Sequence, residues 1–330
     1  MEDMNVIGFF GIFKQSFKTI FSRKKIFTQI TLAFILPLAI IFVVEMEISR
    51  HFFRQIDNIT IPYYLNYPRQ ATAVKWIYYA LFTIAYFILL TVFSILATAA
   101  GVFTVASVYT GREIVLRDVI KIVPKVWKRL YITFAFIYIT ELLYDVIGTV
   151  ATEIPGPVFD YTGLGEIFIL IILILYVFGF LYLSVVCQLA SVVTVLESIH
   201  GFQALKKGKD LAKGKKTVGI GIAFVLYGVL AGLIVVCLLF VEYGYAYYSL
   251  ALIWRVLIGV SCGIVLLMLF LVFIVTQTVL YMVCKSYHQE AIDKLSLSTF
   301  LGAYMGETVV YPGAGEEIQL RSTQPPTQQV

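Results

Sequence analysis

Six long apolar runs constrain the fold of this chain more than any other feature. They extend from about Ile26 to Val44, Val74 to Tyr109, Leu130 to Val150, Ile167 to Ile199, Val218 to Val241 and Leu252 to Cys284. Each run is close to or longer than the roughly 20 residues that an α-helix needs to cross a bilayer. Since lipid cannot satisfy backbone polar groups, such runs have to be helical. The sequence therefore predicts an all-α polytopic membrane protein with six transmembrane helices.

Composition supports this class and indicates a partner. Hydrophobic residues make up 60% of the chain and charged residues 14%, whereas soluble domains contain about 25% charged residues. The net charge of +5 comes from basic residues that lie beside apolar runs. We therefore expect anionic membrane lipid as the partner of these residues and no nucleic-acid binding.

Three basic segments precede the apolar pairs: Asn5 to Lys25, Arg112 to Arg129 and Gly201 to Thr217. The third contains six lysines and one aspartate, and its apolar residues fall on one helical face (Phe202, Leu205, Gly208, Leu211 and Ala212). This pattern predicts helices that lie in the membrane surface with their cations towards headgroups. The candidate headgroup-binding residues are Lys125, Lys128, Arg129, Lys206, Lys207, Lys209, Lys213, Lys215 and Lys216.

The distribution of basic residues predicts the topology. The three basic segments and the residues after Cys284 contain 20 of the 25 lysines and arginines, and the other five lie in or beside the alternate loops. The positive-inside rule then places both termini in the cytosol. On this topology Asn58, in the sequon Asn58-Ile59-Thr60 within a polar loop from Glu45 to Gln70, lies outside and is a glycosylation candidate. We expect the membrane to be that of the endoplasmic reticulum or the plasma membrane.

An internal repeat is indicated by the order of segments. Each basic segment leads into a shorter and then a longer apolar run, and Thr-Val pairs recur near the inner end of the longer runs, at Thr104, Thr194 and Thr278. The alternative is a chance period in an apolar chain with regular loops. The repeat predicts units at 1–110, 111–200 and 201–290, followed by a cytosolic tail at 291–330 whose end is disordered.

Several stretches carry a resemblance to known families. QITLAFILPL, VPKVWKRL, CQLASVVTVLES continued by GFQALKKGKDLAKGKK, and YHQEAIDKLSLSTFLGAYMGE resemble a plant family of uncharacterised six-span integral membrane proteins. More distantly, the repeated unit is similar to the membrane domain of some bacterial glycerophosphodiester phosphodiesterases. The resemblance implies architecture; the hydrolase domain is not in this sequence, so no activity follows from it.

Catalytic and cofactor motifs are not found in the sequence. The segment Gly208 to Thr217 departs from a phosphate-binding loop in its glycine spacing and in Lys216, which stands where serine or threonine belongs. His51, His200 and His288 fall on different predicted sides of the membrane, which excludes one site for all three. We expect no enzymatic activity, cofactor or metal.

Carboxylates inside the third run are the best functional candidates. Glu141 and Asp145 are four residues apart and share a helical face, and an ionised carboxylate near the middle of a bilayer costs on the order of 2.5 kcal/mol or more. We hypothesise a network of Asp145 and Arg255 near the outer leaflet, in which Glu242 competes for Arg255, with Glu141 facing the bundle. In the alternative, the third helix sits shallow and both acids reach headgroups. Glu197 is expected to pair with the lysine segment.

Small and polar residues inside the runs predict contacts between helices. Ala97 and Gly101 form a small face that permits close approach of another helix. Gln188 and Gln277 are interpreted as interhelical hydrogen-bonding groups, with substrate contact as the alternative.

Two functions follow from these features. The first is a non-enzymatic membrane component that binds anionic lipid through its cytosolic basic helices and acts as a scaffold, trafficking factor or membrane organiser. The alternative is a transporter or channel with a path lined by Glu141, Gln188 and Gln277.

Overall fold

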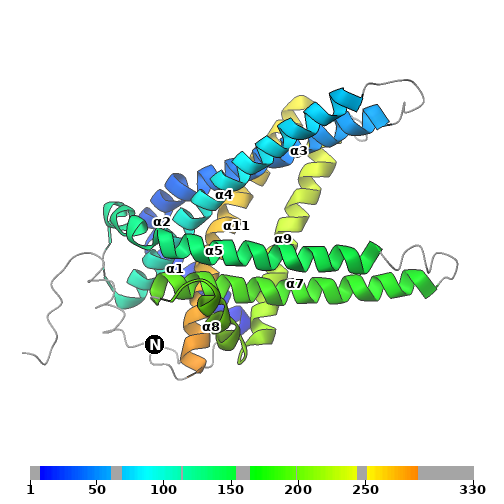
Figure 1. Ribbon diagram of the computed structural model, residues 1–330. Helices are drawn as coiled ribbons and strands as arrows, with labels where there is room; N and C mark the ends of the chain where they lie inside the picture. Colours follow the sequence, from blue (N-terminus) through cyan, green and yellow to red (C-terminus); the bar gives the residue numbers. More distant parts are fainter. Residues whose placement is uncertain are drawn as a thin grey trace, which may run out of the picture.

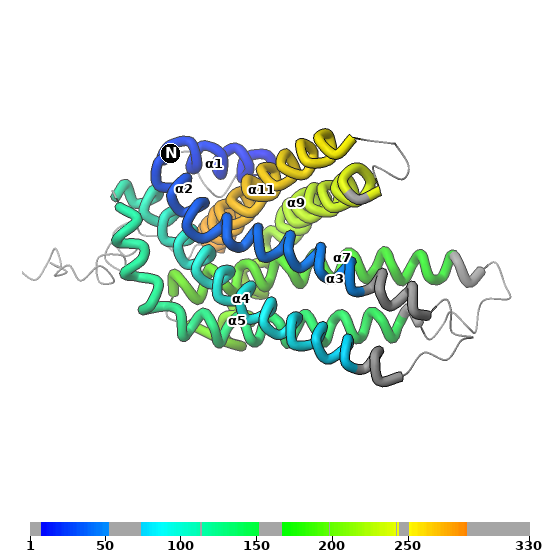
Figure 2. Tube along the Cα trace, turned by 90° about the horizontal axis from the view of Figure 1, so that it is seen from above, coloured from blue at the N-terminus to red at the C-terminus, as the bar shows by residue number. Residues whose placement is uncertain are grey.

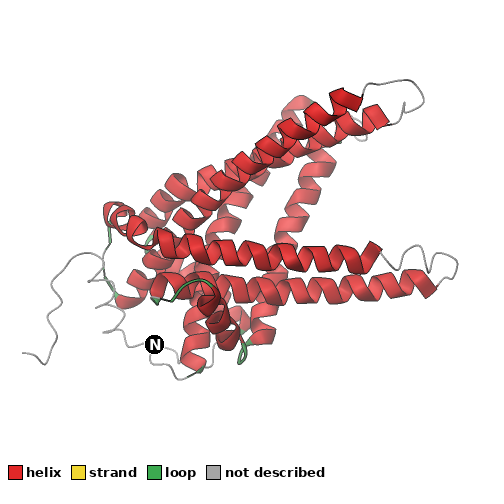
Figure 3. Ribbon diagram, in the orientation of Figure 1, coloured by secondary structure: helices red, strands yellow, loops and turns green. Residues whose placement is uncertain are grey.

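The computed structural model describes residues 8–60, 69–112, 114–153, 164–197, 199–243 and 251–288, which are helical almost throughout and contain no strand (Figure 3). Six stretches are long and apolar enough to cross a membrane. The prediction of an all-α chain with six such helices is confirmed. The elements are α1 (Phe9–Ser22), α2 (Lys24–Ile30), η2 (Thr31–Ile35), α3 (Leu36–Thr60), α4 (Arg69–Thr110), α5 (Leu116–Glu153), α7 (Leu164–Leu196), α8 (Phe202–Ala212), α9 (Lys216–Val236), η3 (Cys237–Glu242) and α11 (Leu252–Tyr287).

The spans form three hairpins, α3 with α4, α5 with α7, and α9 with α11. The hairpins diverge from a common end, and their tips point away from α1 and α8 (Figure 1). We call the end that carries α1 and α8 the inner end and the hairpin tips the outer end.

Burial follows the same division between the two ends. Buried side chains of α4, α7 and α11 are concentrated from Ile95, Leu181 and Leu269 towards the inner end of each helix. The outer halves instead expose large apolar side chains, for example Ile84 and Leu175. Exposed apolar surface on this scale is stable only against lipid or another protein surface. The inner halves therefore form the packed core of the molecule.

The close approach predicted from small residues occurs between α4 and α11. A Cβ atom added at Gly101 would lie 2.2 Å from Cγ2 of Ile274, so only glycine fits without a shift of that side chain. Ala97 on the same face is also buried. The predicted small-residue face is confirmed.

The three threonines of the proposed repeat have similar surroundings. Thr104, Thr194 and Thr278 are buried, and each hydroxyl donates a hydrogen bond to the carbonyl four residues earlier. This likeness is compatible with three copied units, while the repeat and its boundaries stay predictions. The tail at 291–330 lies outside the described residues.

The second basic segment and the third span form one helix, although Pro124 between them is a local signal for a break. Pro124 lies inside α5, and the first part of the helix runs across the inner end before α5 turns into its hairpin with α7 (Figures 1 and 2). Proline removes one backbone hydrogen-bond donor and crowds the preceding turn, and both effects bend a helix. Tertiary packing can keep the helix continuous through such a bend. Val119, Ile122 and Val126 in this first part are buried.

The polar stretch predicted as a loop from Glu45 continues the helix α3 to Thr60. Side-chain pairs support the extension: the Ser49 hydroxyl donates to Glu45 at 2.8 Å, and Arg50 pairs with Glu47 at 2.8 Å. Polar residues at these spacings stabilise an exposed helix as well as they suit a loop. The backbone of Asn58 is thus helical, and its side chain lies outside the described part.

Candidate functional site

A cavity of about 290 Å³ lies between the spans, and side chains from all six of them line it. Most of the lining is apolar, with contributions from Phe134 on α5, Leu230 on α9 and Phe270 on α11. A mainly apolar cavity with a few polar groups is typical of small-molecule sites. This is the candidate functional site.

Three sequence candidates meet in this cavity. Glu141 on α5, Gln188 on α7 and Gln277 on α11 all line it, although 47 and 89 residues separate the neighbouring members of the set. Gln188 and Gln277 are largely buried. The structure therefore brings together the three residues that the sequence proposed for a transport path.

Other polar residues of the cavity were missed by sequence reasoning. The Gln188 amide donates a hydrogen bond to the Ser184 hydroxyl at 3.0 Å, and this hydroxyl lies 2.7 Å from the Tyr227 hydroxyl on α9. Ser184 and Gln188 are four residues apart and so share one face of α7. This spacing could have identified Ser184 as a neighbour of Gln188 from the sequence. The chain of hydrogen bonds joins α7 to α9 at the cavity wall.

Glu141 lies well outward of the inner end of α5. Thr133, on the same helix, is 2.9 Å from Thr194 near the inner end of α7, and eight residues further along α5 correspond to about 12 Å. Its side chain is half-buried. Within the described ranges, its carboxylate has no hydrogen-bond or ion-pair partner.

The hypothesised pairing of Asp145 with Arg255 is wrong. Asp145 is exposed and accepts a hydrogen bond from the Tyr176 hydroxyl at 2.8 Å. Arg255 donates its Nε hydrogen to the carbonyl of Val241 at 2.7 Å. The two residues belong to hairpins that diverge towards their tips (Figure 1). The side chain of Glu242 lies outside the described part.

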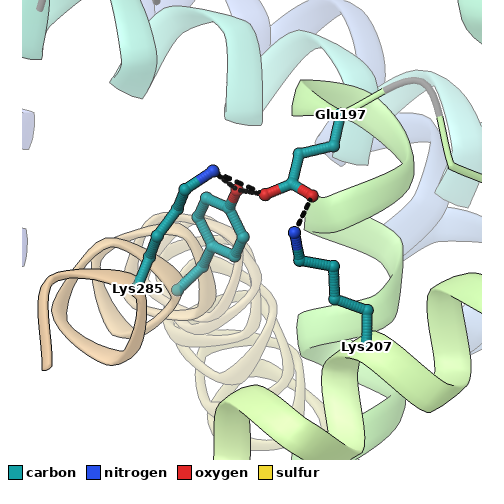
Figure 4. Close-up of polar contacts among 4 residues, drawn as sticks. Glu197, Lys207 and Lys285 are labelled. Carbon is teal, nitrogen blue, oxygen red and sulfur yellow. Dashed lines mark hydrogen bonds and ion pairs between the residues drawn. The ribbon is translucent and has the colours of Figure 1, made fainter. Parts of the chain in front are cut away.

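Glu197 forms an ion-pair cluster at the inner end, as expected from the sequence. Its carboxylate accepts from Lys207 of α8 and from Lys285 of α11, each at 2.6 Å, and Tyr281 of α11 donates a further hydrogen bond. Figure 4 shows the two ammonium groups approaching the carboxylate from different helices. We call these four residues the inner clasp. It fastens α7, α8 and α11 to one another.

Partners of the Glu197 carboxylate set its ionisation. Burial alone would raise the pKa of this carboxyl, but the hydrogen bonds from Lys207, Lys285 and Tyr281 outweigh burial and hold the pKa below its usual value. The clasp is therefore charged at neutral pH.

The apolar face of α8 packs against protein, which corrects the prediction that it lies on lipid. Leu205, Gly208, Leu211 and Ala212 are buried, and α8 makes its most extensive contacts with α7. At Gly208 an added Cβ would lie 2.8 Å from the Val186 carbonyl oxygen. Phe202 alone among the predicted apolar residues is strongly exposed, at 67%.

The candidate headgroup residues differ in exposure. Lys125, Lys128, Lys206 and Lys209 are exposed and Arg129 is half-buried. Contacts with protein groups include these: Lys207 pairs with Glu197, Lys213 pairs with Asp210 at 2.6 Å, Lys215 lies over the Tyr287 ring and Lys216 lies over the Tyr182 ring.

Groups that hold metals or form disulfides are not assembled in the described ranges. No three histidine, cysteine or acidic side chains come close enough there to share a metal ion. The four cysteines, Cys187, Cys237, Cys262 and Cys284, are all free thiols.

Comparison with known proteins gives one result. Neither curated proteins nor solved structures gave a match. A family model does match nearly the whole chain, over residues 1–323. The chain therefore belongs to the family described as Domain of unknown function (DUF8558).

Proposed function

We propose that this protein carries a small solute across its membrane through the central cavity. The observation that carries the proposal is the convergence of Glu141, Gln188 and Gln277, from three different helices and two hairpins, on one cavity. Residues that served only as pairwise helix contacts would not have to share a single space. In this role they line the solute's path, and no enzymatic step is required.

The energetic position of Glu141 supports this proposal. A carboxylate at this depth costs on the order of 2.5 kcal/mol or more unless it is paired, protonated or hydrated, and none of the described side chains pairs with it. A bound solute or water in the cavity would supply the missing interaction. An intramembrane acid facing a cavity is therefore better explained by a ligand than by packing.

The packing of the two ends also suits transport. The inner halves are closed by buried side chains and by the inner clasp, whereas the outer halves separate and expose their apolar faces. In alternating access, each conformational state of a transporter is closed at one end and open at the other. The basic-residue count favours the inner end as the cytosolic end.

The proposal predicts that Glu141→Gln abolishes transport. Purified protein in proteoliposomes would be given a mixture of isotope-labelled small amines, carboxylates and alcohols, and solute uptake would be measured by mass spectrometry. At least one solute should enter faster than into empty liposomes, and Glu141→Gln should remove this excess because it removes the charge while keeping the shape.

The matched control is Glu47→Gln, since Glu47 is an exposed acid of α3 paired with Arg50 outside the cavity. This control should transport at the wild-type rate. Equal uptake by wild-type and Glu141→Gln protein would contradict the proposal.

Binding of anionic lipid at the inner end is a second proposed function, of a scaffold or membrane organiser. Helix α1 buries Ile12 and Ser16 against the bundle and exposes Phe10, Phe17 and Phe21 on its opposite side. An exposed aromatic stripe beside basic residues is typical of a helix that enters the headgroup region. Lys206 and Lys209 extend the basic surface on α8.

Lipid retained during purification tests this second function. Protein extracted from membranes that contain equal phosphatidylcholine and phosphatidylserine should retain an excess of phosphatidylserine. Replacing both Lys206 and Lys209 with glutamine should reduce the excess, because each lysine near such a surface contributes about 1 kcal/mol. The control is Lys75→Gln in the outer half of α4. Retention unchanged by the double substitution would count against this function.

A further inference from the structure

We infer that the central cavity binds an organic ammonium ion that carries an apolar body. This inference rests on the proposed function, since it names the class of solute that the same cavity would accept. It is carried by the charge, the aromatic groups and the surroundings of the cavity.

The charge of the lining selects a cation. Among the described residues that line the cavity, Glu141 is the one carboxylate, and none is a lysine, arginine or histidine. An anionic solute would meet an unpaired carboxylate at low dielectric, and repulsion there is strong. The Gln188 and Gln277 amides and the Ser184 and Tyr227 hydroxyls offer oxygen acceptors to ammonium hydrogens.

The aromatic groups of the lining point to the same class. Phe134, Tyr227, Phe270 and Phe273 come from three helices and border the same space as Glu141, and the Tyr227 and Phe273 rings are 5.7 Å apart in an edge-to-face arrangement. Ring faces attract organic cations, and a desolvated contact contributes about 2 kcal/mol. An acid together with several rings is a suitable environment for a substituted ammonium group.

A bare metal ion fits the cavity less well. Ca²⁺ takes about six to eight oxygen ligands and Mg²⁺ requires a near-ideal octahedron, whereas the cavity offers one carboxylate among mainly apolar walls. A solute with an apolar body would use those walls. The volume of about 290 Å³ limits that body to a small ring or a short chain.

The sequence on both sides of Glu141 is acidic. Between Arg129 and Lys206 the sequence contains no lysine or arginine, but it contains Glu141, Asp145, Glu153, Asp160, Glu166 and Glu197. A local excess of charge of one sign raises the concentration of oppositely charged solutes. Asp145, exposed one helical turn outward from Glu141, lies on this side of the cavity.

Binding of three matched solutes tests the inference. 2-Phenylethylammonium, 2-phenylethanol and 3-phenylpropionate share a phenyl ring and differ in charge. Their binding to the full-length protein in nanodiscs would be measured calorimetrically, with empty nanodiscs subtracted. We expect the ammonium compound to bind most tightly, and Glu141→Gln to weaken it by about tenfold or more while the alcohol changes little.

A second variant keeps the test decisive if Glu141→Gln protein does not fold. Phe273→Leu retains an apolar wall and removes a ring face, so ammonium binding should weaken by about threefold or more with little change for the alcohol. The control is Phe178→Leu, an exposed position outside the cavity. Equal affinities for the ammonium compound and the alcohol, or no effect of either cavity variant, would overturn the inference.

The uptake assay distinguishes failure of this inference from failure of the transport function. If Glu141-dependent uptake occurs for the carboxylate or the alcohol and not for the amine, transport stands and the cation class is wrong. If no solute is taken up and none binds, both are wrong.

Discussion

Glu141 and Glu197 are carboxylates of the same bundle with opposite surroundings. Glu197 receives two lysines and a tyrosine at the inner end, whereas Glu141 faces a cavity without a partner among the described residues. A satisfied buried charge mainly holds helices together, and an unsatisfied one marks a site for a ligand. The contrast separates a structural role from a proposed functional role.

The ionisation of Glu197 gives a prediction on pH. Because its folded-state pKa is lowered, the clasp adds stability above the unfolded pKa of about 4.3 and loses it as pH falls through the still lower folded pKa. Glu197→Gln should reduce the free energy of unfolding by about 1–3 kcal/mol at pH 7. The difference between the two proteins should shrink below about pH 4.

Thermal unfolding of wild-type and Glu197→Gln protein at both pH values measures this difference. Glu47→Gln is the control, since an exposed pair such as Glu47 with Arg50 contributes only about 0–1 kcal/mol. A difference that is absent at pH 7, or one that does not change with pH, would show that the clasp does not stabilise the fold.

Residue type and depth were enough to identify single candidates, but not their partners. Glu141, Gln188 and Gln277 could be selected because polar groups are costly in an apolar run. The pairing of Asp145 with Arg255 could not be judged, because equal depth does not reveal that two hairpins diverge. Ser184 and Tyr227 were missed because a single hydroxyl in a helix is common and gains meaning only from its neighbour.

At the scale of helices, an amphipathic pattern shows that one face is covered and does not show by what. The apolar face of α8 was assigned to lipid and is covered by α7. The same energetic gain accompanies burial against either surface. Helix α1 shows the opposite arrangement. Its phenylalanine stripe stays exposed, and the other side of the helix packs against the bundle.

Two glycine-to-alanine substitutions, one as the test and one as the control, examine the packing of α8. Gly208→Ala should loosen α8 from α7, because the new Cβ would contact the backbone of Val186 at 2.8 Å and of Ala190 at 3.0 Å, which a side-chain rotation cannot relieve. Gly232→Ala is the control, since nothing lies within 4 Å of its Cβ position. Alanine there should add about 0.5–1 kcal/mol of helix stability.

Hydrogen–deuterium exchange of the α8 amides would measure the effect. Faster exchange over Phe202–Ala212 in Gly208→Ala, and unchanged exchange in Gly232→Ala, is the expected result. Equal exchange in both variants would mean that α8 is not held by this contact.

Helix boundaries were the least predictable elements. Pro124 and the charges after Glu45 are local signals for a break or a loop, but both stretches are helical. In α5 the buried residues on both sides of Pro124, including Val119 and Leu130, pack against the bundle and carry the helix through its bend. Tertiary packing of this kind outweighs local propensity and cannot be read from a single run.

At the scale of the whole molecule, three hairpins share a packed inner end and separate towards their tips (Figure 1). The number of spans could be predicted from the lengths of the apolar runs. The angles between the hairpins could not be predicted from the sequence. The cavity is lined by side chains of all six spans, and many of these belong to the inner halves of the helices. Among the described lining residues there is one acid and no base, a composition that arises only in the assembled bundle.

The reactivity of Cys187 is the most direct test of an outward-accessible, cation-accepting cavity. Cys187 lines the cavity, and replacing Cys237, Cys262 and Cys284 with alanine leaves it as the only thiol. Two membrane-impermeant methanethiosulfonates, one ending in trimethylammonium and one in sulfonate, would be added to the outer side of oriented proteoliposomes. The account predicts that Cys187 is modified and that the cationic reagent reacts faster.

Glu141→Gln should bring the two rates together, because the preference arises from that carboxylate. A protein that retains only Cys284, which is buried at the inner end and does not line the cavity, should react with neither reagent. An unreactive Cys187, or a cation preference that survives Glu141→Gln, would contradict the account.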